Sequence, residues 1–181
     1  MNSSRILIAG IGNIFFGDDA FGVEVARRLA ARSLPDGIQV VEFGIRGLDL
    51  TYAILEPHEA VIIVDAVPRG GKPGTLYVIE PELRPIEDPD SPDPMMETHN
   101  LDPLKVLALA RSMGGKIDRV LLIGCEPDIL GEEEELQFGL SESLRSAVEE
   151  AVLVVESLVR KLLGESESTA KTGPSVSNLP V

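Results

Sequence analysis

Apolar and polar positions along the chain follow two different periods. Mostly apolar segments, rich in Val, Ile and Leu, occur at 6–9, 38–43, 60–66 and 119–125, and such segments are typical of strands. Between them, apolar residues recur every three or four positions, which is the spacing of one helix face. Helices are predicted from about residue 21, at 49–55, at 104–113 and after Ser141. This alternation predicts a three-layer α/β fold, with a mostly parallel, doubly wound sheet and helices on both faces.

One further strand is expected to be antiparallel. Residues 74–79 are apolar, bounded by proline and glycine, and follow the preceding strand with no helical pattern between them. Residues 81–97 are dense in proline and acidic residues, which predicts a long irregular loop. Beyond Gly164 the composition turns polar, so we expect a single domain over residues 1–164 and a disordered, mobile tail over 165–181.

Two positions are predicted to begin helices. Asp102, followed by Pro103, is a typical helix start, and Ser141 is expected to cap the last helix. That last helix has the longest apolar stripe of the chain, which indicates a core-facing helix and not a binding surface. The stripe consists of Leu144, Val148, Ala151, Val152, Val155, Leu158, Val159 and Leu162.

Composition narrows the classes of partner. The chain has 181 residues, of which 44% are hydrophobic, and this suits one well-packed domain. Its formal charge of −14 argues against nucleic acid or an anionic membrane as the main partner, and a basic protein segment would suit it better. A single cysteine excludes an internal disulfide. Because no membrane-span or signal-peptide pattern is visible, we expect the protein in the cytoplasm.

Candidate chemistry begins in the turn after the first strand. Residues 10–22 contain paired glycines, which let the backbone approach other groups closely, and then Asp18 and Asp19 directly before a helix. One of these two carboxylates is expected to serve as the helix cap, and we favour Asp18 for that role. Asp19 is then available for binding or catalysis.

Two more residues are predicted to join Asp19. Asp65 ends the strand at 60–66, and it would lie beside the first turn if the strand order is 2-1-3, because ligands in such sheets bind beyond the carboxyl ends of the strands. His99 lies just before the helix that follows Asp102. Two carboxylates and one imidazole form a ligand set for zinc or a neighbouring transition metal. His58 lies between Pro57 and Glu59 at a helix end, away from the predicted edge of Asp19 and Asp65, and is expected on the surface.

These residues carry a resemblance to a known family. Gly-Ile-Gly-Asn at 10–13, Gly-Asp-Asp-Ala-Phe-Gly at 17–22, Val-Asp-Ala at 64–66 and Thr-His-Asn at 98–100 resemble the motifs of hydrogenase maturation endopeptidases. The glycine loop at 44–47 and Gly-Cys-Glu-Pro at 124–127 are similar too, and the likeness spans residues 5–164. Some family members have Glu at the position of Asp19.

The resemblance implies a specific activity. The family removes a C-terminal extension from the precursor of the large subunit of a nickel-iron hydrogenase, after nickel has been inserted. Asp19, Asp65 and His99 would then contact nickel supplied by the precursor, and zinc or another divalent ion is an alternative. The metal would either polarise the scissile carbonyl or lower the pKa of a bound water. A monomer acting on one large precursor is expected.

Other interpretations start from single residues. A dinucleotide-binding protein would use the first glycines with Glu42 on the ribose, but Phe15 stands where that fingerprint needs a small residue. A phosphoacceptor receiver domain would have its acids directly after the first strand, and a Lys in place of the segment that begins at Cys125. Cys125 itself is a candidate nucleophile or a small buried hydrophobe. Arg46 is either a substrate contact or a solvated side chain.

Overall fold

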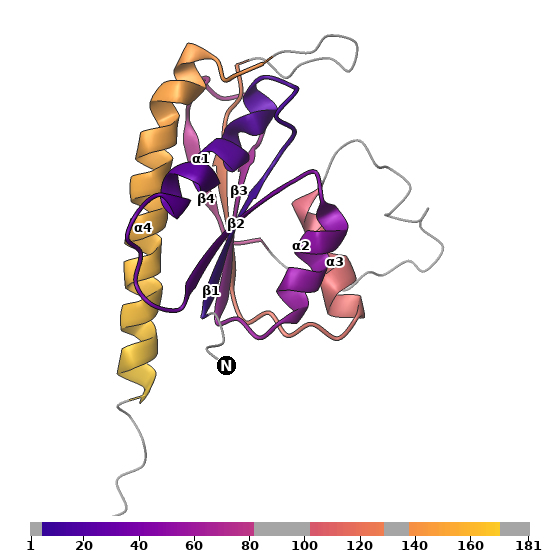
Figure 1. Cartoon of the computed structure of the whole chain (residues 1–181), viewed down its shortest axis with the longest axis vertical. Helices are drawn as coiled ribbons and strands as arrows, with labels where there is room; N and C mark the ends of the chain where they lie inside the picture. The colour runs from indigo at the N-terminus through magenta and orange to yellow at the C-terminus, as the bar shows by residue number, and fades with distance from the viewer. Residues whose placement is uncertain (1–4, 82–101, 129–137, 171–181) are drawn as a thin grey trace, which may run out of the picture.

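A computed structural model describes residues 5–81, 102–128 and 138–170. Its single sheet has the strand order β2-β1-β3-β5-β4 (Figure 1). All neighbouring strands are parallel except the pair β4 and β5, which is antiparallel. The strands are β1 (Ile6–Ile11), β2 (Ile38–Gly44), β3 (Ala60–Ala66), β4 (Leu76–Ile79) and β5 (Val120–Cys125). The predicted mostly parallel sheet, the antiparallel strand and the 2-1-3 order are confirmed.

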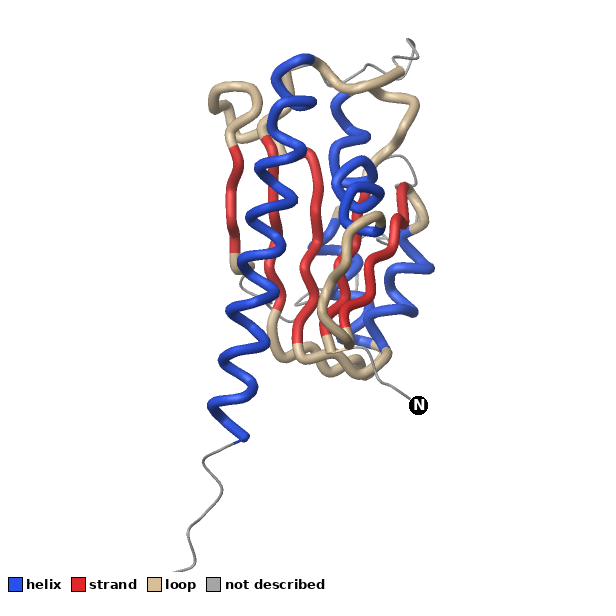
Figure 2. Tube along the Cα trace, turned by 60° about the vertical axis from the view of Figure 1, so that its left-hand side comes forward, coloured by secondary structure: helices blue, strands red, loops and turns tan. Residues whose placement is uncertain are grey.

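Four α-helices form the two outer layers. They are α1 (Phe21–Ala30), α2 (Gly47–Leu55), α3 (Pro103–Ser112) and α4 (Glu142–Ala170), and a short 3-10 helix, η1 (Asp18–Ala20), precedes α1. Helices α1 and α4 cover one face of the sheet and α2 and α3 cover the other (Figure 1). Figure 2 shows α4 lying along the strands and continuing past their ends.

The alternation of side chains along the strands divides the core in two. In β1, Ile6 and Ile8 pack under α1 and α4, whereas Leu7, Ala9 and Ile11 pack under α2 and α3. Since both faces of β1 are covered, its whole length is apolar, as a central parallel strand requires. The predicted stripe of α4 lies in the first of these two clusters, so its interpretation as core is confirmed.

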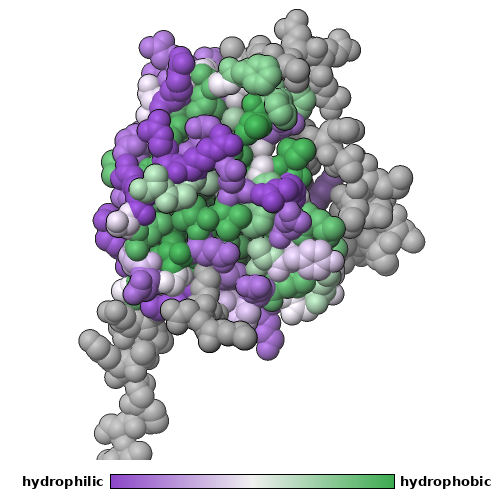
Figure 3. Space-filling view, in the orientation of Figure 1, coloured by the Kyte–Doolittle hydropathy of each residue, from purple (hydrophilic) through white to green (hydrophobic). Residues whose placement is uncertain are grey.

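The outer surface mixes apolar and polar side chains. In Figure 3, hydrophobic residues gather in the middle of the visible face, with hydrophilic residues around them. The edge strand β2 has mostly half-buried side chains, because only one neighbouring strand covers its edge. Among the described residues, none of the helices has the length and apolar composition needed to cross a membrane.

Helices α3 and α4 begin where the sequence predicts, but α4 ends later than expected. The Asp102 side chain accepts a hydrogen bond of 2.9 Å from Leu104 N–H, and the Ser141 hydroxyl accepts one of 3.4 Å from Leu144 N–H, so both predicted caps are present. Helix α4 continues to Ala170, past the predicted boundary at Gly164, because residues 165–169 contain no proline or glycine to end it. Residues 82–101 and 171–181, which include most of the predicted loop and most of the predicted tail, lie outside the described residues.

His58 is buried, so its predicted surface position is wrong. It follows α2, and its Nε2 atom lies 2.9 Å from the carbonyl oxygen of Ala53. The backbone of His58 also forms an isolated parallel bridge with Ile117, near the start of β5. The imidazole therefore helps to fix the link between α2 and β3, at the end of the sheet opposite the carboxyl ends of the parallel strands.

Candidate functional site

Asp19 and Asp65 both lie at the carboxyl end of the parallel strands. β1 and β3 are neighbours in register from Ile6 opposite Ala60 to Gly10 opposite Val64. Asp65 follows Val64 directly, and Asp19 lies in η1, the first helical turn after β1. The strand order therefore brings the two carboxylates to one edge, where doubly wound sheets bind ligands.

Glycines allow the first turn to pack directly on the sheet. A Cβ atom on Gly22 would overlap the carbonyl oxygens of Val64 and Ile11, so α1 begins in contact with both β1 and β3. Gly12 has φ of +122°, a conformation that L side chains rarely adopt, and a Cβ there would overlap the backbone of Asp19. The glycines of the first motif thus place η1 over the ends of two central strands.

Burial disfavours the charged form of both carboxyl groups, and the charge of Asp19 disfavours that of Asp65 further. Burial raises the pKa of Asp19, although a 2.6 Å hydrogen bond that its Oδ2 accepts from Asn13 N–H opposes the shift. Burial raises the pKa of Asp65 to about 8, with further contributions from the charges of Asp19 and Asp102, while the bond from Ala66 N–H opposes them. Such surroundings favour a protonated Asp65 or a nearby cation.

His99 lies outside the described residues, so its position stays a prediction. The nearest described residue after it is Asp102, the cap of α3. Because the charge of Asp102 acts on Asp65, the start of α3 lies at the same edge as the carboxylate pair. Within residues 5–81, 102–128 and 138–170, no three histidine, cysteine or acidic side chains are grouped so as to hold a metal ion.

Asp18 does not cap the helix that follows it, so the favoured prediction is wrong. No side chain caps η1 or α1. The Asp18 carboxylate is 1% exposed and accepts hydrogen bonds from Asp128 N–H at 2.9 Å and Ser141 N–H at 2.7 Å. It therefore ties the turn that carries Asp19 to the segment after β5 and to the start of α4. Backbone N–H groups 110 and 123 residues away satisfy its charge.

Glu126 is a second buried carboxylate, and its role was not predicted from the sequence. Its Oε1 and Oε2 accept hydrogen bonds from the backbone N–H groups of Arg69 and Gly70, and its Oε2 accepts one of 2.8 Å from the Tyr77 hydroxyl. Burial alone raises the pKa of Glu126, but these hydrogen bonds bring it below the ordinary value. An acidic residue directly after an apolar strand was the available signal.

Cys125 has the properties of a small buried hydrophobe. It ends β5, is fully buried and belongs to the apolar cluster under α1 and α4. Burial, with the charges of Asp18 and Glu126, raises the pKa of its thiol to about 12. Because the thiolate is the nucleophilic form, this environment disfavours nucleophilic catalysis by Cys125.

Arg46 lies on the loop between β2 and α2 and is anchored locally. Its guanidinium donates to the carbonyl oxygens of Glu42 and Phe43 and forms an ion pair of 3.3 Å with Asp49. The adjacent Gly44 carbonyl accepts a hydrogen bond from Gly12 N–H, which joins this loop to the first turn. Arg46 thus has partners within its own loop, and a substrate contact is not needed to explain its place.

The dinucleotide and receiver interpretations are not favoured. The Glu42 carboxylate, which would bind a ribose, instead forms an ion pair of 2.7 Å with Arg27. Phe15, which stands where the dinucleotide fingerprint needs a small residue, is 47% exposed beside the glycine turn and makes an edge-to-face contact with Phe138. The acids follow β1 only after an intervening turn, unlike those of a receiver domain.

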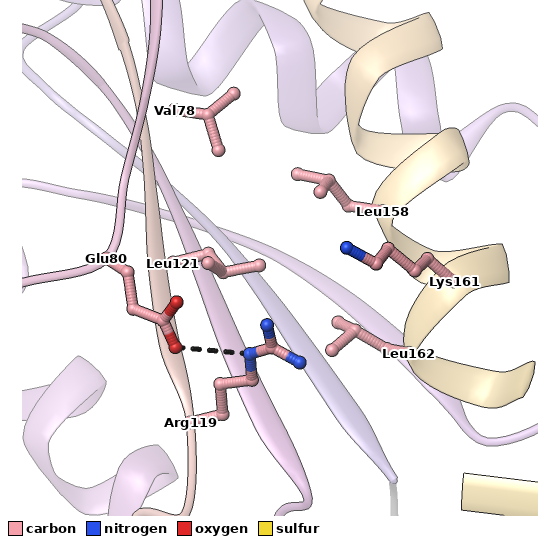
Figure 4. Close-up of a pocket in the computed structure, with 7 residues that line it drawn as sticks. All are labelled: Val78, Glu80, Arg119, Leu121, Leu158, Lys161 and Leu162. Carbon is pink, nitrogen blue, oxygen red and sulfur yellow. Dashed lines mark hydrogen bonds and ion pairs between the residues drawn. The ribbon is translucent and has the colours of Figure 1, made fainter. Parts of the chain in front are cut away.

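A cavity of about 220 Å³ lies away from the two aspartates. Arg119, just before β5, forms an ion pair of 3.2 Å with Glu80 across it (Figure 4). Leu158 and Leu162 of α4 point into the same space. Since Arg119 precedes β5, this cavity lies at the amino end of that strand. It is separate from the edge of the sheet that carries Asp19 and Asp65, which we call the carboxylate edge.

Comparisons with known proteins agree on one family. The family model for HycI, described as hydrogenase maturation protease, matches residues 23–158, a segment that begins after Asp19. The hydrogenase expression/formation protein HupD of Rhizobium leguminosarum is 34% identical over 155 residues, covering 84% of this chain and 75% of that protein. HupD of Rhodobacter capsulatus is 38% identical over 128 residues, and this chain spans 57% of its length.

A solved structure supports the same conclusion. The hydrogenase maturating endopeptidase HybD from Escherichia coli is 27% identical and superposes with a TM-score of 0.67, covering 87% of this chain and 93% of that one. Its α/β fold matches the five-stranded sheet described above. The family model covers most of the chain, and the fold agrees with it, so this chain belongs to the hydrogenase maturation proteases, a family of peptide hydrolases.

Proposed function

We propose that this enzyme removes the C-terminal extension from the nickel-loaded precursor of a nickel-iron hydrogenase large subunit. Asp19, Asp65 and His99 bind the nickel that the precursor carries. The proposal rests on the family and on the carboxylate edge together, since the family gives the class of reaction and the edge gives a place for a cation.

The observation that carries the proposal is the coupling of Asp19 to Asp65. Burial raises the pKa of both carboxyl groups, the charge of Asp19 raises that of Asp65 further, and no cationic side chain is among the described groups that act on their pKa values. A divalent cation between them would remove this repulsion. Carboxylate oxygen and imidazole nitrogen are donors that nickel and zinc both accept.

A donor set of three protein groups suits recognition of a metal in another molecule. A closed structural site uses four protein ligands, whereas three leave positions for ligands from the precursor. The same donors accept zinc, so exchange of the precursor's metal tests whether nickel is specifically needed. His99 would supply the only imidazole of the set, and it precedes Asp102 by three residues in the sequence.

Peptide hydrolysis adds water to the scissile carbonyl and breaks the C–N bond, with a proton passing to the leaving amine. The precursor's metal supplies polarisation of the carbonyl or activation of the water. The chain's own residues hold the scissile segment near the carboxylate edge. We expect a monomer to act on one precursor, in the cytoplasm, and light scattering and cell fractionation test these two points.

The test is a processing assay with a purified large-subunit precursor in nickel-loaded and nickel-free forms. Mass spectrometry follows release of the extension by the wild type and by Asp19→Asn, Asp65→Asn and His99→Ala. We expect cleavage of the loaded form by the wild type alone. Asp118→Asn, which changes an exposed carboxylate near the amino ends of the strands, is the matched control and should cleave normally.

Two results would contradict the proposal. Cleavage of the nickel-free precursor at the same rate would remove the role of nickel. Full activity in Asp19→Asn or Asp65→Asn would show that the functional site does not lie at this edge. Replacement of nickel by zinc in the precursor, with cleavage retained, would broaden the metal requirement to divalent ions of similar chemistry.

A further inference from the structure

The loop between β3 and β4 is fastened to the end of β5 by Glu126. The loop leaves β3 one residue after Asp65 and crosses the carboxyl end of β5 to reach β4. Arg69 N–H and Gly70 N–H both donate to the Glu126 carboxylate, which is 4% exposed. Gly74 N–H donates to the Glu126 carbonyl oxygen at 2.8 Å. The loop therefore has a fixed path above the strand ends.

Tyr77 connects this loop to a row of paired residues that runs across β3, β5 and β4 and contains Asp65. Asp65 is paired in register with Gly124, and Gly124 with Tyr77, so the three residues face the same side of the sheet. Neighbouring strands lie roughly 4.8 Å apart, which places Tyr77 roughly 10 Å from Asp65, with the Val67 side chain against Gly124. The Tyr77 hydroxyl donates to Glu126 at 2.8 Å, and this fixes the ring.

Arg69 is held over the face of that ring. Its guanidinium carbon lies 5.3 Å from the ring centroid of Tyr77, within the range of a cation–π contact. The residue is exposed, and in the part of the chain that the structure describes no carboxylate forms an ion pair with it. Other arginines do form ion pairs with carboxylates, namely Arg5, Arg27, Arg32, Arg46 and Arg119.

We infer that Arg69 is a specificity-determining residue that binds a carboxylate of the precursor, three or four residues from the scissile bond. This inference rests on the proposed function. The distance follows from the row, because an extended peptide advances roughly 3.3 Å per residue and Tyr77 lies roughly 10 Å from Asp65. Glu126 and Tyr77 are positioning residues that hold Arg69 at that place.

The chemistry of the Arg69 side chain favours a carboxylate as its partner. An arginine stacked on an aromatic ring keeps the N–H groups at its edge free, and these match the two oxygens of a carboxylate. In a chain with a formal charge of −14, an acidic segment would be repelled unless a cation were placed for it. The carboxylate has two possible sources, an acidic side chain or the end of the extension.

Steady-state kinetics on the nickel-loaded precursor test the inference. Arg69→Ala is expected to raise KM about tenfold with kcat within about twofold, the effect of losing one charge-assisted contact. Arg69→Lys should recover only part of the loss, because lysine lacks the planar fork. Lys72→Ala, which removes another exposed cation of the same loop, is the matched control and should leave KM unchanged.

A double-mutant cycle separates positioning from general structural damage. Glu126→Gln places an amide against backbone N–H donors, so the loop should lose its fixed path and KM should rise. In the Arg69→Ala background the same change should have no further effect on KM, because the residue it positions is gone. Additive effects on KM would contradict the positioning role of Glu126.

Changes in the precursor identify the carboxylate. Replacing acidic side chains near the cut by their amides should raise KM for the wild type but not for Arg69→Ala. If the C-terminal carboxylate of the extension is the source, one residue added to the extension should raise KM for the wild type but not for Arg69→Ala. Equal KM values for wild type and Arg69→Ala would overturn the inference while leaving the proposed function intact. If the wild type cleaves no precursor, the proposed function fails. In that case, equal affinity of wild type and Arg69→Ala for the precursor would also overturn the role of Arg69.

Discussion

At the scale of single residues, the carboxylates at one edge have contrasting surroundings. Asp18 and Glu126 are buried with backbone N–H donors around them, so their charges serve the structure. Asp19 and Asp65 accept one backbone hydrogen bond each, and the charge of Asp19 disfavours the charged form of Asp65. Charges left uncompensated in this way are typical of functional sites, because stability alone would not maintain them.

The Asp65 carboxyl predicts a pH-dependent stability. Its pKa rises from the ordinary 3.8 to about 8 in the folded state, owing to burial and to the charges of Asp19 and Asp102. Between these values the folded state binds more protons than the unfolded state, so the free energy of unfolding falls as pH rises. Asp65→Asn should remove this loss and be more stable than wild type by about 2 kcal/mol near the upper end of that range, a figure reduced for partial solvent access.

Urea unfolding of the metal-free protein at a series of pH values measures the difference. The advantage of Asp65→Asn should vanish as the pH approaches the ordinary pKa of the carboxyl. Asp118→Asn, an exposed carboxylate, should follow the wild type throughout. A difference that stays constant with pH would show that the Asp65 carboxyl is not perturbed in the folded state.

Asp18 predicts a loss of stability instead. Asp18→Ala would leave the N–H groups of Asp128 and Ser141 without their acceptor inside the protein. We expect the free energy of unfolding to fall by about 2–3 kcal/mol, measured by chemical denaturation, because buried unsatisfied donors are costly. Asp118→Ala should change it by less than about 0.5 kcal/mol. A similar small change in Asp18→Ala would mean that water replaces the carboxylate at no cost.

At the scale of elements, the tight contact of α1 with β1 and β3 sets the position of Asp19. Gly22→Ala would bring a methyl group against the carbonyl oxygens of Val64 and Ile11, which belong to rigid strands. We expect it to lower the free energy of unfolding by about 1–3 kcal/mol, as overpacking does. Far-UV circular dichroism with urea unfolding measures this loss.

Gly164 provides the matched control within another helix. It is exposed in α4, and a methyl group at this position would contact no other atom. Gly164→Ala should therefore stabilise the protein by about 0.5–1 kcal/mol through helix propensity alone. If both variants behaved alike, the effect of Gly22→Ala would come from propensity, and the close packing of α1 on the sheet would not be needed to explain it.

The elements themselves were largely predictable from local pattern. The apolar run at 60–66 coincides with β3, and the start of α3 follows from the Asp102 cap next to proline. The end of α4 was not predictable from composition, because polar residues without proline or glycine continue a helix readily. The burial of His58 depends on a bridge to Ile117, a contact between segments far apart in sequence.

At the scale of the whole molecule, the sheet order turns separate motifs into one site. The placement of Asp19 beside Asp65 could be predicted because parallel neighbours share a carboxyl-end edge, and the order β2-β1-β3 makes β1 and β3 neighbours. The roles of Asp18 and Glu126 could not, since their partners lie 110, 123 and 57 residues away in sequence. The position of His99 stays a prediction, which rests on its sequence motif and on the position of Asp102.

The most direct test of this account is the nickel dependence of precursor binding. Association of loaded and nickel-free precursor with immobilised enzyme is followed from its start, before cleavage is complete. The wild type should bind the loaded form at least about tenfold more tightly, the gain of one strong metal contact. Asp19→Asn should lose that preference, while Asp118→Asn keeps it. An undiminished preference in Asp19→Asn would contradict the claim that this carboxylate edge recognises the precursor's nickel.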